Sequence, residues 1–175
     1  SGVQAEIVNT AALSGSDPDT LYVKYNKTGT NNTAAVFSDG ETITGTNSDS
    51  VALSAVVDTT ATGSAATVKQ GVYYINGFFV QNDDETLILD KYTNSPSYRI
   101  GFTITESFVT PNDDSSLNDN ATGSSNVNAP GAHRFKILLT LAKKTLASTE
   151  DSTFVELMRV ENGTIKAEAR STEYS

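Results

Sequence analysis

Residues 71–80 read GVYYINGFFV, and this stretch decides the fold class. Asn76 and Gly77 separate two runs of aromatic and β-branched residues, and both tolerate the positive φ angles of a tight hairpin turn. Side chains alternate between the two faces of a strand, so Tyr73 and Tyr74 are expected on opposite faces. We therefore predict a β-hairpin, with core packing on one face and cross-strand pairing on the other.

Short alternating runs of the same kind recur along the chain. The run at 98–109 is predicted to be a central strand, because Ile100, Phe102 and Ile104 share one face. A second Asn-Gly pair predicts a hairpin at residues 162–163. Further strands are expected at residues 21–25, 86–89, 154–160 and 164–167, and in the run that begins at Arg134.

Two segments near the middle of the first half are less decisive. An Asp-Gly pair at Asp39 and Gly40 lies between two β-prone runs, and we predict a hairpin there. Residues 51–57 are apolar but contain Ala and Leu, so a short helix and a strand both remain open.

The fold class follows from this density of hairpin signals. We expect an all-β protein, either a sandwich or a distorted barrel of antiparallel hairpins. Residues 1–19 are expected to form an N-terminal arm or linker, residues 20–168 a β-rich domain, and residues 169–175 a C-terminal tail. The beginning of the chain lacks the features of a secretory signal, and we expect a piece of a longer protein.

Charge and composition exclude several classes of partner. The chain has 21 acidic and 12 basic residues, for a net charge of -9. The phosphate-neutralising charge of nucleic-acid binding proteins is therefore missing, and an anionic membrane surface is disfavoured for the same reason. No apolar run approaches the roughly 18–20 residues that span a bilayer. We expect neither nucleic acid nor membrane as a partner.

The sequence offers little for catalysis. His133 is the only histidine, and it lies at the exit of a long loop, where a histidine usually bonds the backbone or faces solvent. The carboxylates of residues 83–85 lie in a polar turn and are expected to bond the local backbone. Residues 113–120 are rich in the oxygen ligands of calcium but lack the spacing of a calcium-loop motif. We expect no enzyme activity, no metal site and no cofactor.

Five further observations are the stretches at residues 71–80, 87–92, 97–102 with Glu106, 114–119 and 128–136. Together these stretches resemble a structural domain of the tail-fibre or baseplate proteins of tailed bacteriophages. The resemblance covers about residues 20–168, and its most specific part is the irregular loop sequence at 114–136. Where this chain has His133, members of that family often have an acidic residue. The resemblance implies a location in the virion, in the phage tail, and a role in holding other phage structural proteins.

The long loop at residues 110–133 is the expected partner-contact site, because loops beyond about 12–15 residues are usually functional or disordered. We expect it to be ordered, and to bind through hydrogen bonds and burial of Leu117. The predicted contact residues are Asp113, Asp114, Leu117, Asn118, Asp119, Pro130 and Arg134.

The sequence also leads us to expect self-association, and it leaves one alternative function open. Exposed strand edges favour association, so we expect a homo-oligomer, with a trimer among the expected forms because phage fibres are usually trimeric. The alternative function is recognition of carbohydrate on a host surface, in which Tyr74 or Phe79 stacks on sugar rings.

Overall fold

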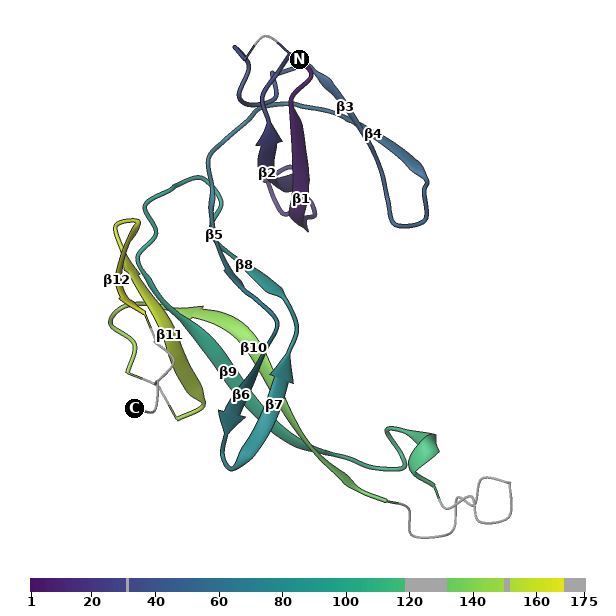
Figure 1. Cartoon of the computed structure of the whole chain (residues 1–175), viewed down its shortest axis with the longest axis vertical. Coiled ribbons are helices and arrows are strands. Elements are labelled where there is room, and N and C mark those ends of the chain that lie inside the picture. The colour runs from purple at the N-terminus through teal and green to yellow at the C-terminus, as the bar shows by residue number, and fades with distance from the viewer. Residues whose placement is uncertain (31, 119–131, 150–151, 169–175) are drawn as a thin grey trace. The chain divides into compact units, whose positions relative to one another are not determined.

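The structure is a computed structural model that describes residues 1–30, 32–118, 132–149 and 152–168 (Figure 1). Its regular elements are β-strands and one short 3-10 helix, so the predicted all-β class is confirmed. The strands pair as β1-β2, β3-β4, β5-β8, β6-β7 and β10-β9-β11-β12, and none of these sheets closes into a barrel.

The chain divides into two compact units. Unit 1 comprises Ser1–Ala66 and Ile88–Pro96, and unit 2 comprises Thr67–Leu87 and Ser97–Ser175. The boundary therefore falls within two paired strands, β5 (Ser64–Val68) and β8 (Glu85–Asp90). The strand predicted at residues 86–89 is confirmed as part of β8.

Unit 1 contains two antiparallel strand pairs. Strand β1 (Gln4–Ala11) pairs with β2 (Thr20–Lys27), and β3 (Thr42–Thr46) pairs with β4 (Ala52–Val56). The strand predicted at residues 21–25 is confirmed as part of β2. Residues 4–11, which we expected in an arm or linker, form β1, which pairs with β2 along its length with register shifts after Gln4 and at Val8. The helix alternative for residues 51–57 is excluded by β4.

The turn predicted at Asp39 and Gly40 is confirmed, but the prediction that two strands pair on either side of it is wrong. These residues form a turn, in which the Glu41 N–H donates to the Ser38 C=O at 3.0 Å, but residues 32–38, which lead into the turn, do not form a strand. The preceding segment is held instead by Phe37, whose ring packs on Tyr25 and whose N–H donates to the Tyr25 hydroxyl at 3.3 Å. The hairpin that does form is β3–β4, and its turn is organised by a side chain.

That side chain is Asn47, the residue that follows β3. Its Oδ1 accepts hydrogen bonds from the N–H groups of Asp49 at 3.0 Å and Val51 at 2.9 Å. An asparagine that bonds the backbone two residues ahead mimics a backbone turn. The Asn47 side chain thereby fixes the loop that brings β4 back onto β3.

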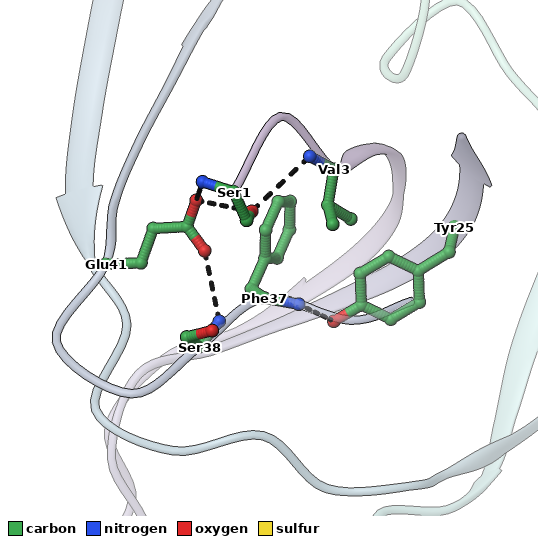
Figure 2. Close-up of polar contacts among 6 residues, drawn as sticks. All are labelled: Ser1, Val3, Tyr25, Phe37, Ser38 and Glu41. Carbon is green, nitrogen blue, oxygen red and sulfur yellow. Dashed lines mark hydrogen bonds and ion pairs between the residues drawn. The ribbon is translucent and has the colours of Figure 1, made fainter. Parts of the chain in front are cut away.

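A polar cluster holds the first residues of unit 1 against the segment before β3 (Figure 2). Both the α-ammonium and the hydroxyl of Ser1 donate to Glu41 Oε1, at 2.7 and 2.6 Å. The other carboxylate oxygen of Glu41 accepts from the Ser38 N–H at 3.1 Å. These contacts lower the pKa of Glu41 from 4.5 to about 2, the bond from the ammonium group first among them.

Unit 1 also joins two distant parts of the sequence. Lys91 Nζ forms an ion pair with Asp17 Oδ2 at 2.9 Å, and the Tyr92 hydroxyl donates to the same carboxylate at 3.2 Å. The hydrogen bond from Lys91 lowers the pKa of Asp17. Leu89, from the same later segment, is buried. Residues 88–96, which complete unit 1, therefore follow a segment of unit 2, residues 67–87, in the sequence.

Unit 2 is organised around strand β9 (Tyr98–Val109), which lies between β10 (Arg134–Lys144) and β11 (Phe154–Glu161). The predicted central strand is thus confirmed, with Phe102 and Ile100 as its fully buried side chains. Strand β12 (Thr164–Glu168) pairs with β11, and the turn between them confirms the second Asn-Gly hairpin. Asn162 and Gly163 there have φ angles of 48° and 74°.

The hairpin of β6 (Gly71–Ile75) and β7 (Phe78–Asn82) packs on one face of this sheet (Figure 1). The ring of Tyr73 meets the ring of Phe102 edge-on, with centroids 4.9 Å apart. At the hairpin turn, Asn76 Nδ2 donates to Glu106 Oε1 at 2.7 Å. Asn76 and Gly77 have φ angles of 49° and 93°, which confirms the predicted tight turn.

The opposite face of the sheet is held by a charged network. Arg99, whose side chain is buried, donates to the Glu156 carboxylate and to the Ser148 C=O. Arg159 also donates to Glu156, and the pKa of Glu156 is lowered by the bonds from Arg159 and Arg99. The ring of Phe154 lies under the cationic groups of Arg99 and Lys144. The network ties β9 to β11 and to the loop before β11.

Gly101→Ala should destabilise unit 2, because the new Cβ would collide with the C=O of Val155 and approach the Cα of Glu156 to 2.9 Å. Overpacking of this kind costs about 1–3 kcal/mol in the free energy of unfolding. Urea denaturation followed by circular dichroism measures the loss. Gly45→Ala in β3 is the matched control, since nothing lies within 4 Å of its Cβ position. Equal effects of the two substitutions would contradict the close approach of β11 to Gly101.

The Glu41 cluster should make unit 1 sensitive to acid. Because the folded pKa of about 2 lies below the ordinary value of 4.5, the stabilisation is complete above about pH 4.5 and disappears as the pH falls toward 2. Thermal melts of the chain and of its Glu41→Gln variant should therefore differ at pH 6 and converge between about pH 4.5 and 2. A difference in melting temperature that stays constant over that range would show that Glu41 titrates normally.

Candidate functional site

The first residues of the long loop are occupied with shaping their own backbone. Asp113 accepts hydrogen bonds from the N–H and hydroxyl of Thr110, at 2.9 and 2.8 Å. Asp114 caps the 3-10 helix η1 (Ser115–Leu117) and accepts from the Ser116 N–H at 2.9 Å. Bonds from Thr110 lower the pKa of Asp113, and bonds from Ser116 lower that of Asp114. Both residues are exposed.

The other predicted contact residues are only partly brought together. Leu117 and Asn118 are half-buried, and the Leu117 C=O accepts from the Ala132 N–H at 2.8 Å, which joins the loop start to its end. Arg134 is exposed at the beginning of β10, opposite Val109. Asp119 and Pro130 lie outside the described residues, as does most of the predicted ordered loop. Partner contact through this loop stays a prediction.

The outer face of hairpin β6–β7 is an exposed aromatic surface. Tyr74 lies opposite Phe79 across the hairpin, their ring centroids are 5.4 Å apart, and their side chains are 68% and 81% exposed. Val72 shares this face and is also exposed. We call Val72, Tyr74 and Phe79 the outer hairpin face. The predicted division of the aromatic residues, core on one side and cross-strand pairing on the other, is confirmed.

A second aromatic cluster was missed by the sequence analysis. Phe135 of β10 lies opposite Phe108 of β9, and its ring also meets Phe78 from the hairpin tip, with centroids 5.5 Å apart in both contacts. All three rings are partly exposed. Phe108 and Phe135 lie on either side of the long loop in the sequence. Phe108 is one residue before the end of β9 and Phe135 is one residue after the start of β10, so an antiparallel pairing of these two strands predicts that the two rings lie opposite each other.

Potential metal-ligating side chains do not gather in the described part of the chain. Across residues 1–30, 32–118, 132–149 and 152–168, no three His, Cys, Asp or Glu side chains gather as a metal site would require. His133 is exposed beside the first residue of β10. The chemistry available at the two aromatic clusters is burial of apolar surface and ring stacking.

Comparison with known protein families shows which family the chain belongs to. The model of the family described as "Domain of unknown function (DUF4815)" matches residues 7–175. The chain belongs to the DUF4815 family. No curated protein and no solved structure matches this DUF4815 chain significantly. The match begins within β1, so the family extends over residues that we expected to precede the domain.

Among the described residues of this DUF4815 chain, no helix is both long enough and apolar enough to cross a bilayer.

Substitutions at neighbouring tyrosines should separate structural from surface roles. Tyr73→Ala removes the ring that packs on Phe102 and should lower the free energy of unfolding by about 2–4 kcal/mol. Tyr74→Ala removes an exposed ring that packs on its cross-strand neighbour Phe79, and should cost less than about 1 kcal/mol. Chemical denaturation of both variants measures the contrast. Similar losses would mean that the outer hairpin face belongs to the core.

Proposed function

We propose that this chain is a non-catalytic structural component of a tailed-bacteriophage virion, in a tail fibre or baseplate. It acts as an attachment scaffold that holds other phage structural proteins and further copies of itself. The outer hairpin face is the observation that carries the proposal. Exposed aromatic side chains grouped on a fixed hairpin are typical of protein interaction sites. The sequence resemblance to phage tail proteins supports the setting.

Energetics favour a protein partner for this face. Full burial of an aromatic side chain stabilises by about 1.5–3 kcal/mol, so Tyr74 and Phe79 together offer a large part of a binding free energy. Tyr74 and its neighbours lose little conformational entropy on binding, because their strands are already paired and the hairpin is anchored through Tyr73. A preformed apolar face of this kind suits permanent assembly.

Unit 1 adds a second argument for assembly. Every residue of β4 is exposed, including Leu53, and the Val56 side chain at its end is 67% exposed. A two-stranded hairpin with little covered surface is marginally stable in water. A neighbouring chain that covers β3–β4 would stabilise it, and the virion supplies such neighbours.

Carbohydrate recognition on a host surface is the second candidate function. Tyr74 and Phe79 provide ring faces on which a sugar can stack, and Gln81 of the same hairpin face is exposed for hydrogen bonding. However, the two rings are inclined by 58°, so one flat sugar ring cannot lie on both. The inclination makes a protein surface the better occupant.

Replacing Tyr74 and Phe79 together by Ser should dissociate the chain without unfolding it. We expect the unaltered chain to form oligomers in light scattering, and the double variant to be monomeric at the same concentration, because the apolar area that drives association is lost. Ile165→Ser is the control, since Ile165 is 57% exposed and lies on β12, the edge strand of the four-stranded sheet opposite to β10. Mass spectrometry of purified tailed particles should detect the chain.

Two outcomes would contradict the proposal. An oligomer that survives the double substitution would exclude the outer hairpin face as its interface. A monomeric chain that binds oligosaccharides on a glycan array, and loses that binding in the double variant, would establish the carbohydrate alternative instead.

A further inference from the structure

Strand β10 forms an edge of the four-stranded sheet in unit 2, and its two sides differ in pairing (Figure 1). One side forms the complete ladder with β9, from Arg134 opposite Val109 to Lys144 opposite Arg99. No strand among the described residues pairs with the other side. An unpaired edge presents a row of N–H and C=O groups that can accept a further strand.

The directions of the backbone groups follow from two hydrogen bonds. The N–H of Leu141 donates to Glu85 Oε2 at 2.9 Å, so it points away from β9. The N–H of Ile104, opposite Leu139, donates to the Thr153 C=O at 2.7 Å and so points away from β10. Because these directions alternate along an antiparallel pair, the N–H groups of Phe135, Ile137 and Leu139 also point outward.

Glu85 occupies the outward direction at Leu141 only. Toward the beginning of the strand, residues 134–136 and Leu138 are exposed, and no side chain of the described residues accepts from the outward N–H groups of Phe135 and Ile137. We call residues 134–138 the free edge of β10, because Leu139 beyond them is buried. It is long enough for several backbone hydrogen bonds to an added strand.

The free edge is basic on one face. Four of the twelve Lys and Arg residues of the chain lie in β10, which contains no acidic residue, although the chain carries a net charge of -9. Arg134 and Lys136 are exposed on the face that also bears Leu138. Neither forms an ion pair with a carboxylate of the described residues, and Arg134 Nη1 makes a bond of 3.4 Å to the neighbouring His133 C=O.

The other face of the free edge is apolar. Phe135 and Ile137 lie on it, and Phe78 from the hairpin tip extends it with a ring 5.5 Å from that of Phe135. A strand added to this edge sends alternate side chains to the two faces. Acidic side chains would meet Arg134 and Lys136, and apolar side chains would meet Phe135 and Phe78.

We propose that the free edge of β10 binds an extended segment of a partner protein in which acidic and apolar residues alternate, by β-strand addition. The backbone groups of Phe135 and Ile137 supply the hydrogen bonds, and the two faces of the edge select the sequence. This site is separate from the outer hairpin face and does not require a phage partner, so it goes beyond the proposed function.

A labelled, capped peptide that alternates Glu with Val is the probe, and fluorescence anisotropy on the full chain measures its binding. Hydrogen exchange reports the mode: amides of Phe135 and Ile137 should gain protection with the peptide, whereas those of Lys136 and Leu138, already bonded to β9, should change little. Peptides with Lys in place of Glu, or with all Glu residues grouped at one end, should bind at least about tenfold more weakly.

Two kinds of variant complete the test. Arg134→Glu with Lys136→Glu should weaken binding by about tenfold or more, whereas Lys24→Glu with Lys27→Glu, exposed on β2, should change it less than about twofold. Ile137→Pro removes an outward N–H, spares the ladder with β9, and should abolish binding. Circular dichroism confirms that each variant is folded.

Several results would overturn this inference. Equal binding of the grouped-Glu peptide would show attraction by charge alone, without strand addition. Protection of Phe135 and Ile137 that depends on chain concentration and not on peptide would identify a second copy as the occupant. Absence of any binding or protection in the unaltered chain would exclude the site, while the outer hairpin face would remain as proposed.

Discussion

The edge-on contact between Tyr73 and Phe102 is the interaction on which unit 2 depends. It fixes which face of the β6–β7 hairpin looks inward, and strict alternation along a strand then determines the rest. Because Tyr73, Ile75 and Val80 point toward the sheet, Tyr74 and Phe79 must lie on the opposite, outward face of the hairpin. The exposed position of these two rings is therefore a geometric consequence of how the core is closed.

Local chemistry accounts for the parts of the fold that could be predicted from the sequence. Both Asn-Gly turns adopt positive φ angles because these residues carry that preference themselves, whatever surrounds them. The strand Tyr98–Val109 was predicted with its observed limits, since its alternation is long and its core face is continuous. Strand β1 was missed because six of its eight residues are exposed, which leaves no clear alternation to recognise. The turn at Asp39 and Gly40 was predicted correctly, but which segments pair beside a turn depends on distant contacts, here the attachment of Phe37 to Tyr25.

The candidate sites show the same limit more strongly. The exposure of Tyr74 and Phe79 followed from period-two alternation once the hairpin was placed, so these residues could be named in advance. The cluster of Phe78, Phe108 and Phe135 joins three strands, and its assembly requires the register of β9 against β10, which no local pattern encodes. The overall composition could not reveal the positive charge of β10 either. The net charge of -9 is a sum over the whole chain, whereas β10 alone carries four Lys and Arg residues and no Asp or Glu.

The division of unit 1 between two separated segments has a consequence for any attempt to dissect the molecule. Residues 1–66 end before Leu89, a buried side chain of that unit, and before Lys91 and Tyr92, which hold Asp17. A contiguous gene fragment that encodes all of unit 1 must also encode residues 67–87 of unit 2. A contiguous fragment that encodes all of unit 2 must likewise include residues 88–96 of unit 1. Folding of the amino-terminal part must therefore wait for synthesis of the chain well beyond its own first boundary, and limited proteolysis between the units requires two cleavages instead of one.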